Sequence, residues 1–211
     1  MRTWERTNIW AKICAGAILI VVAVYVWLSA EQRAVADAAL AGPVLVGDVE
    51  VARIDGSGNL ERPVEIDTWV FLGSSLGMGY NGQVPFDPDT PGNFQTVLME
   101  PAAYRHFQET GRFAAGSMFA LYFHGSRTNV SINQSGFVMG EELALEIHLK
   151  DKKRFPETGF NFYFFGPDDQ LAETQSAPNG CTSCHIEHGQ TDGVFTQFYP
   201  ALWKKLGEKS P

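Results

Sequence analysis

The segment 142–150 alternates between apolar and polar positions and carries the clearest secondary-structure signal in the chain. Because successive side chains of a strand point to opposite faces, this alternation predicts a strand with one apolar face directed into the core. The opposite face carries Glu146 and His148, and it is either exposed to solvent or directed into a functional site. The apolar positions of the predicted strand are Leu143, Leu145, Ile147 and Leu149.

Shorter apolar or alternating runs predict the remaining elements. A short helix is expected from Pro101, since proline favours the first helical position, and a second helix is expected over 192–206. Cys181 is expected in a long polar loop. Strands without a regular βαβ alternation indicate an α+β domain with a largely antiparallel β-sheet and a few short helices. The further predicted strands cover residues 44–54, 69–72, 94–99, 117–124 and 160–165.

Residues 13–30 form an uncharged, apolar run that follows several basic residues. A run of about 18 residues lies between the apolar core of a signal peptide and a short membrane anchor, and both interpretations stay open. The basic flank keeps the N-terminus cytoplasmic and directs the remainder outward. We therefore expect residues 1–43 to be a signal peptide or membrane anchor plus a tether, and residues 44–211 to be one exported domain. The predicted location is the periplasm, either in solution or anchored to the inner membrane.

Composition narrows the function further. The chain has 211 residues, 45% of them hydrophobic, which suits one folded domain with a substantial core. Its net charge of −8 excludes nucleic acid as a partner, because phosphate binding needs a basic surface. Contact with a membrane is expected only through the N-terminal segment.

The stretch Cys181-Thr182-Ser183-Cys184-His185 is the main candidate for chemistry. Cys-x-x-Cys-His is the attachment signature of a c-type haem, in which two thiols form thioethers and the histidine ligates the iron. A zinc site would need about four ligands, and a redox dithiol would usually follow a βαβ pattern. Neither alternative suits these surroundings, although His188 offers one more zinc ligand. We predict one covalent haem c near the C-terminus, with thioethers at Cys181 and Cys184 and His185 as iron ligand.

Several short motifs together resemble the cytochrome P-460 family, which also contains the cytochromes c′-beta. They run in the same order from about Gly56 to the C-terminus. In sequence they are Trp69-Val70-x-Leu72-Gly73, Pro101-x-x-Tyr104, Thr110-Gly111-x-Phe113-x-x-Gly116-Ser117, Met139-Gly140, Glu146, Lys150-Asp151-x-x-Arg154-Phe155, the haem motif, and Asp192-x-Val194-Phe195-x-x-Phe198-Tyr199-Pro200.

This resemblance implies a largely antiparallel α+β protein that usually forms a homodimer and has a five-coordinate haem with an open distal site. The family's enzymatic branch oxidises hydroxylamine to nitric oxide or nitrous oxide. In that branch a lysine is cross-linked to the haem edge, five residues after the glycine matched here by Gly116. This chain has Leu121 at that position, and a leucine cannot form the bond. We therefore expect an ordinary c-type haem.

The cytochromes c′-beta lack the cross-link and bind nitric oxide or carbon monoxide at an apolar distal face. By this resemblance Phe119, Leu121 and Phe123 form such a face, although they would also suit an ordinary strand core. Glu146 matches a carboxylate that relays protons in the enzymatic branch. Arg154 is expected to pair with a haem propionate or with Asp151.

Three functions are considered, and the third is ranked last because the resemblance implies an open site. The first is binding of nitric oxide or a similar small ligand, for scavenging, carriage or detoxification. The second is oxidation of hydroxylamine despite the missing lysine, with Glu146 as proton acceptor. The third is electron transfer to a redox partner such as another cytochrome, with a second iron ligand from His106 or Met139. His124 is a candidate distal ligand in the same way as His106, although each also suits an ordinary surface position, and Met139 is expected in the core.

Overall fold

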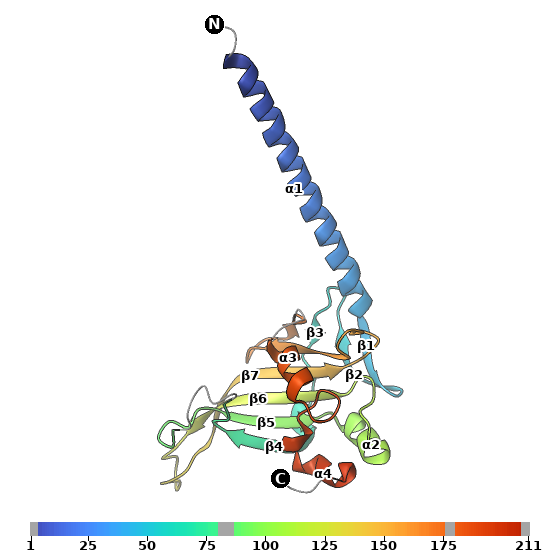
Figure 1. Ribbon diagram of the computed structural model, residues 1–211. Coiled ribbons are helices and arrows are strands. Elements are labelled where there is room, and N and C mark those ends of the chain that lie inside the picture. Colours follow the sequence, from blue (N-terminus) through green and yellow to red (C-terminus); the bar gives the residue numbers. More distant parts are fainter. Residues whose placement is uncertain (1–3, 80–86, 176–179, 208–211) are drawn as a thin grey trace.

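The computed structural model describes residues 4–79, 87–175 and 180–207, with side chains from Val22 onward. Two antiparallel sheets and several short helices form the domain, and one long helix, α1 (Trp4–Leu40), projects from it (Figure 1). This arrangement confirms the predicted α+β class. The smaller sheet contains β1 (Gly42–Val46), β2 (Val49–Ile54), β3 (Leu60–Glu61) and β9 (Leu171–Ala172), in that order.

The larger sheet is a meander whose strands neighbour one another in chain order. Its central strands, β6 and β7, are the longest, and each pairing in the sheet is antiparallel. Around it lie α2 (Pro101–Thr110), α3 (Gly180–His188), α4 (Pro200–Leu206) and the short 3-10 helices η1 (Ile66–Thr68) and η2 (Thr196–Phe198). The strands are β4 (Val70–Leu76), β5 (Phe94–Met99), β6 (Met118–Arg127), β7 (Val138–Lys150) and β8 (Phe160–Phe165).

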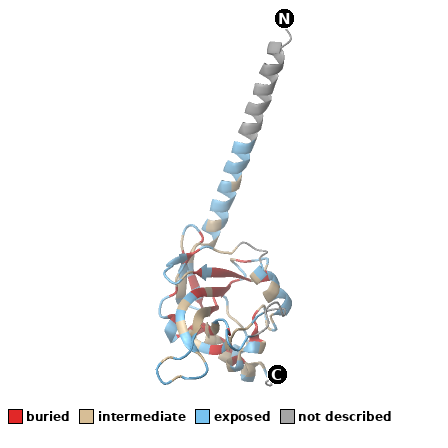
Figure 2. Cartoon of the chain, turned by 90° about the vertical axis from the view of Figure 1, so that its left-hand side faces the viewer, coloured by how far each residue is buried: buried red, intermediate tan, exposed pale blue. Residues whose placement is uncertain are grey.

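Both faces of the larger sheet carry buried residues, and Figure 2 shows the buried strand segments in red within the domain. On one face, Leu145, Ile147 and Leu149 pack with residues of the smaller sheet in one core cluster. On the other face, Phe119 and Val97 pack with α2, α4 and the segment after α3 in a second cluster. A functional cavity on this second face is therefore backed by a continuous sheet.

The alternation of 142–150 predicts the faces of β7 correctly except at its outer end. Leu143 is 41% exposed rather than in the core, and Met139, also expected in the core, is 44% exposed. Irregular pairing on either side of His124 interrupts the register with β6 and separates this end from the packed part of the sheet. The core assignments of Leu143 and Met139 were therefore wrong.

Two helix predictions also needed correction. Cys181 lies in α3 and not in a loop. The expected helix over 192–206 is confined to α4, because residues 191–194 form a tight turn and η2 follows it. Pro200 stands in the first turn of α4. The N–H groups of a first turn have no partner within the helix, so the missing N–H of proline costs no hydrogen bond there.

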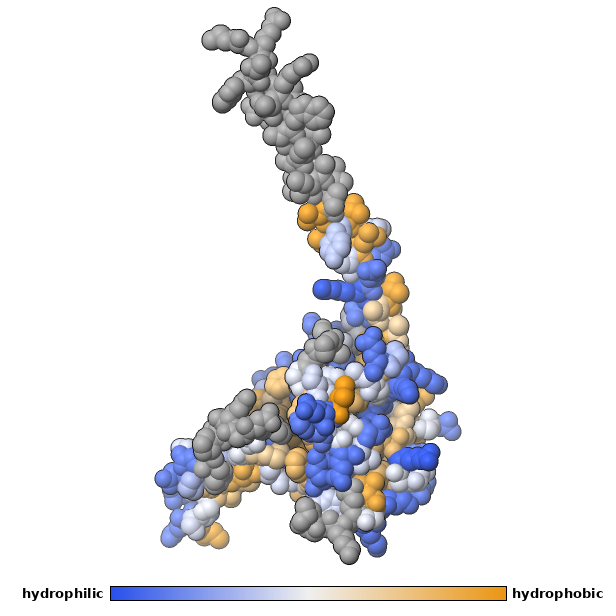
Figure 3. Space-filling model, in the orientation of Figure 1, coloured by the Kyte–Doolittle hydropathy of each residue, from blue (hydrophilic) through white to orange (hydrophobic). Residues whose placement is uncertain are grey.

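The N-terminal helix continues through residues 31–40, which were expected to be a tether. It ends at Leu40, where Arg154 binds main-chain carbonyl groups. Arg154 Nε donates to the Leu40 carbonyl at 3.0 Å and Nη2 donates to the Pro43 carbonyl at 2.6 Å. Apolar side chains between Val22 and Leu28 are exposed on the helix (Figure 3). In the described part of the chain, no helix combines the length and apolarity needed to cross a membrane. The side chains of residues 13–21, half of the predicted signal or anchor run, lie outside the described residues.

Candidate functional site

The haem motif occupies helix α3, which lies against the end of the larger sheet and contacts β8. Cys181 and Cys184 are three positions apart on this helix, so they share one side of it. Both thiols are free and partly exposed. Among the described residues no group of three or more His, Cys, Asp or Glu side chains is placed to hold a metal ion. The zinc alternative, which needed His188, therefore gains no support.

His185 is held in a fixed orientation by a hydrogen bond and by aromatic rings. Its Nδ1 lies 2.7 Å from the Gly193 carbonyl oxygen, which can only accept, so Nδ1 carries the proton and Nε2 keeps its lone pair. The ring centroid lies 4.3 Å from that of Phe195 and 4.8 Å from that of Phe162. Burial lowers the pKa of His185, although the bond to Gly193 opposes this shift. The imidazole is therefore neutral, as a metal ligand must be.

The carbonyl that binds His185 belongs to a two-residue turn between Thr191 and Val194. Val194 N donates to Thr191 O at 3.0 Å, and Thr191 N donates to Val194 O at 3.2 Å. Asp192 and Gly193, the two central residues, have φ values of 52° and 73°. Positive φ at both central positions defines a type I′ turn, for which Asp-Gly is a preferred dipeptide. We missed this turn in the sequence, although Asp192-Gly193 is the signal for it.

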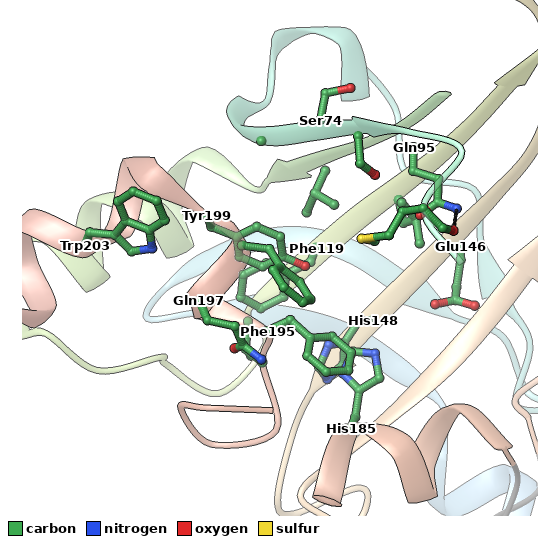
Figure 4. A pocket seen from close by; sticks show the side chains of 17 residues that line it. Ser74, Gln95, Phe119, Glu146, His148, His185, Phe195, Gln197, Tyr199 and Trp203 are labelled. Atoms are coloured by element: carbon green, nitrogen blue, oxygen red, sulfur yellow. Dashed lines mark hydrogen bonds between the residues drawn. The ribbon is translucent and has the colours of Figure 1, made fainter. Parts of the chain in front are cut away.

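A cavity of about 290 Å³ opens between the larger sheet and the segment that follows α3 (Figure 4). It brings together four of the predicted site residues, Phe119, Leu121, Glu146 and His185. The complete lining is Gly73, Ser74, Ser75, Met78, Gln95, Val97, Phe119, Leu121, Glu146, His148, His185, Val194, Phe195, Gln197, Phe198, Tyr199 and Trp203.

Other predicted site residues lie elsewhere. Phe123 is on β6 but does not line the cavity. Arg154 pairs with Asp151, with Nη1 2.5 Å from Oδ2, and this is the second of the two alternatives considered for it. His106 on α2 and His124 on β6 do not line the cavity, and neither does Met139 on β7.

Glu146 is the acidic group of the cavity. It pairs in register with Leu121 on β6 and with Phe164 on β8, so its neighbours across the sheet are apolar. Burial raises its pKa from 4.5 to about 7. Near neutral pH the carboxyl group is therefore close to half protonated, the state in which it can both accept and release a proton.

His148 is a cavity residue that we did not identify from the sequence. It was placed on the possibly wet face of its strand, but it is only 5% exposed, and its ring packs against Phe119, Phe162 and His185. Burial lowers its pKa well below 6.5, and the neighbouring His185 and Lys150 side chains disfavour its protonation further. Its Nε2 has no hydrogen-bond partner among the described residues. The alternation of 142–150, which put His148 on the face of Glu146, was the available signal.

Gln95 also faces the cavity, from β5. Its Nε2 donates to the Met78 carbonyl at 3.1 Å, as the dashed line in Figure 4 shows. This bond orients the amide, and Oε1 is left without a partner in the described part of the protein. No local pattern marked Gln95, because its position follows from strand pairing and not from its neighbours in the sequence.

These groups fit a c-type haem. Two free thiols precede a neutral histidine whose Nδ1 proton is engaged and whose other ring nitrogen can ligate iron. The cavity beside that histidine is walled largely by aromatic and aliphatic side chains, as a porphyrin requires.

Comparison with known proteins agrees with this assignment. Residues 65–196, more than half of the chain, match the sequence model of the family described as Cytochrome P460. No curated protein matches the chain significantly. The matched range includes the cavity strands, the Cys-x-x-Cys-His helix and the turn that holds His185. The chain therefore belongs to the cytochrome P460 family, whose members are c-type haem proteins.

Proposed function

We propose that this protein is an exported mono-haem c-type cytochrome that binds nitric oxide, or a similar small uncharged ligand, for scavenging, carriage or detoxification. Cys181 and Cys184 would hold the haem through thioethers, and His185 would ligate its iron through Nε2. The bound haem would supply an iron with one open coordination position. The chain supplies a rigid neutral imidazole on one side and an apolar wall beside it.

The observation that carries this proposal is the position of Leu121. It lines the cavity beside its cross-strand partner Glu146. The resemblance described above implies that the enzymatic branch of the family has its cross-linking lysine at this position. The neighbouring wall residues Val97 and Phe119 are also apolar. Such a wall provides no hydrogen bonds to water or to an anion, whereas nitric oxide loses little hydration on entry. This wall of the cavity thus favours a small neutral ligand, and the polar groups of the cavity, among them Glu146, lie beside it.

Stopped-flow absorption spectroscopy of the ferrous protein tests the proposal. We expect a five-coordinate spectrum before mixing and rapid, saturable binding of nitric oxide. Leu121→Gln should slow association, because a polar wall retains water, while Leu121→Met, an apolar replacement of similar volume, should leave the rate nearly unchanged. A six-coordinate protein that does not react with nitric oxide would refute the proposal. Mass spectrometry of Cys181→Ala and Cys184→Ala tests the covalent attachment.

Glu146 favours a second candidate, oxidation of hydroxylamine. Its carboxyl group lies in the cavity with a pKa of about 7, which suits transfer of protons from a substrate with N–H and O–H groups. Steady-state turnover with an artificial electron acceptor tests this function. Activity above that of free haem, lost in Glu146→Gln and kept in Glu146→Asp, would favour it over ligand binding alone.

The electron-transfer alternative has less support. It required a second strong iron ligand from His106 or Met139, and both lie outside the cavity. An optical spectrum of the purified protein distinguishes it, since two strong ligands give a low-spin, six-coordinate iron. Transfer of electrons to a partner cytochrome would then be measurable by stopped-flow mixing.

Export and assembly form part of the same proposal. We propose that residues 44–211 reside in the periplasm, in solution or anchored through residues 13–30, and that the domain forms a homodimer as the family usually does. Fractionation of cells that produce the full chain, with N-terminal sequencing of the mature protein, tests the location. Analytical ultracentrifugation tests the dimer, and a concentration-independent monomer would contradict it.

A further inference from the structure

Lys150, the last residue of β7, is a buried cation close to the His185 turn. Its side chain is 6% exposed, and Nζ lies 2.9 Å from Asp192 Oδ2. The same Nζ donates to the Asp192 carbonyl oxygen at 2.5 Å. The rings of Phe113 and Phe160 lie against the ammonium group, with centroids 5.8 and 5.4 Å from Nζ. Lys150 therefore binds both the side chain and the main chain of one turn residue.

A lysine at this position is not explained by stability alone. Taking an ammonium group out of water costs several kcal/mol, and a buried ion pair often contributes less than a well-packed apolar replacement. Burial lowers the pKa of Lys150, and Asp192 opposes this shift. Asp192 is itself exposed, so half of the ion pair remains in water. The contact that an apolar side chain could not reproduce is the bond to the Asp192 carbonyl.

That carbonyl adjoins the one that binds His185. Asp192 and Gly193 are the two central residues of the type I′ turn, and the Gly193 carbonyl accepts the Nδ1 proton of His185. The turn is also fixed by close packing, since a Cβ atom added at Gly193 would lie 2.4 Å from Phe160 Cε1. The turn is thus held by two neighbouring groups, the ammonium group of Lys150 and the ring of Phe160.

We propose that Lys150 is a positioning residue for His185: it fixes the Asp192–Gly193 peptide and thereby sets the strength of the Nδ1–H···O=C bond. A stronger bond at Nδ1 gives the imidazole more electron density to donate from Nε2, so second-shell partners of this kind tune a histidine ligand. The inference rests on the proposed ligation of haem iron by His185. It adds a residue outside the haem motif, at the end of β7, that controls the strength of the iron–histidine bond.

Resonance Raman spectroscopy of the ferrous holoprotein, without nitric oxide, measures the iron–histidine stretch directly. In Lys150→Met, which keeps the apolar stem, the turn loses its bonds to the ammonium group, and we expect the stretch to shift to lower frequency. Asp192→Asn removes the ion pair but keeps the carbonyl bond, and asparagine tolerates the positive φ, so we expect a smaller shift in the same direction. The matched control is Arg62→Met, which removes another partly buried cation, paired with Glu142 and distant from the turn.

An unchanged stretch in Lys150→Met, or an equal shift in Arg62→Met, would overturn the proposal. If Lys150→Met does not accumulate as holoprotein, Asp192→Asn decides, and a stretch identical to that of the wild type then overturns it. Failure of the proposed function has a different signature, because the wild-type protein would then show no iron–histidine band. In that case the proposed role of Lys150 is refuted together with the proposed function.

Discussion

Leu121 on β6 and Glu146 on β7 are direct cross-strand neighbours, and both face the cavity. They belong to a row across the sheet in which Val97 on β5 pairs with Leu121 and Phe164 on β8 pairs with Glu146. The carboxyl group therefore has apolar neighbours on both sides. Among the described residues no cation or donor offsets the effect of burial on Glu146, so burial raises its pKa.

The raised pKa of Glu146 predicts a pH-dependent stability. The native protein holds the Glu146 proton up to about pH 7, whereas the unfolded chain releases it near 4.5. Between these values the native state binds more protons, so the free energy of unfolding falls as the pH rises, by at most about 3 kcal/mol. Urea unfolding of the wild type and Glu146→Gln between pH 4.5 and 8 measures this, and the slope across that window should flatten in the variant. Parallel slopes would show that other groups cause the dependence.

Leu121→Lys should shift the same pKa in the opposite direction. The Cβ atoms of directly paired residues lie about 5 Å apart, so an ammonium group at position 121 would come close enough to Glu146 to stabilise the carboxylate. The pKa of Glu146 should fall toward its ordinary value, and the stability lost between pH 4.5 and 7 should shrink. Leu121→Met is the control, since it leaves the row apolar. Identical pH profiles for the lysine and methionine variants would place the two side chains farther apart than the pairing indicates.

The fold was predictable where one local pattern decided it. The alternation of 142–150 was sufficient to place Leu145 and Ile147 in the core and Glu146 on the other face, because a strand imposes a period of two. It failed at Leu143, where a break in the pairing with β6 takes the strand out of the packed sheet. That break depends on the partner strand, so the alternation of apolar and polar residues in 142–150 does not reveal it.

The sequence predicts the candidate haem-binding residues, but it does not predict which other side chains surround them. Cys-x-x-Cys-His marked the haem-binding segment, but the helix that carries it has little apolar periodicity, and of its side chains only Thr182 is buried. Gln95 and Trp203 reach the cavity from segments more than a hundred residues apart. Their meeting is set by the order of strands in the meander and by the packing of α4 against β4, neither of which a single sequence displays.

Gly193→Ala is expected to disrupt the turn that holds His185. Alanine at φ 73° costs about 1–2 kcal/mol, and its Cβ atom would lie 2.4 Å from Phe160 Cε1. With the usual cost of overpacking, we expect a loss of about 2–5 kcal/mol in the free energy of unfolding. Gly207→Ala isolates the backbone cost, because Gly207 has φ 71° and the described part of the chain places no atom within 4 Å of its added Cβ. Chemical denaturation of both variants provides the measurement, and equal losses would mean that Phe160 moves aside freely.

Phe119 is both a core residue and a cavity wall, so its replacement should affect stability and ligand binding together. It is 4% exposed and packs edge-on against Phe113, with centroids 5.3 Å apart. Phe119→Ala should cost about 3–5 kcal/mol and should also open the cavity wall to water, which would slow the binding of nitric oxide. Phe123→Ala is the matched control on the same strand: Phe123 is only partly buried and does not line the cavity. It should cost about 1–2 kcal/mol in the free energy of unfolding and leave the association rate unchanged.

Denaturation curves and stopped-flow rates for the two variants separate these roles. A slower rate in Phe123→Ala would extend the distal wall to the third aromatic position expected from the sequence, whereas an unchanged rate in Phe119→Ala would reduce that residue to core packing alone.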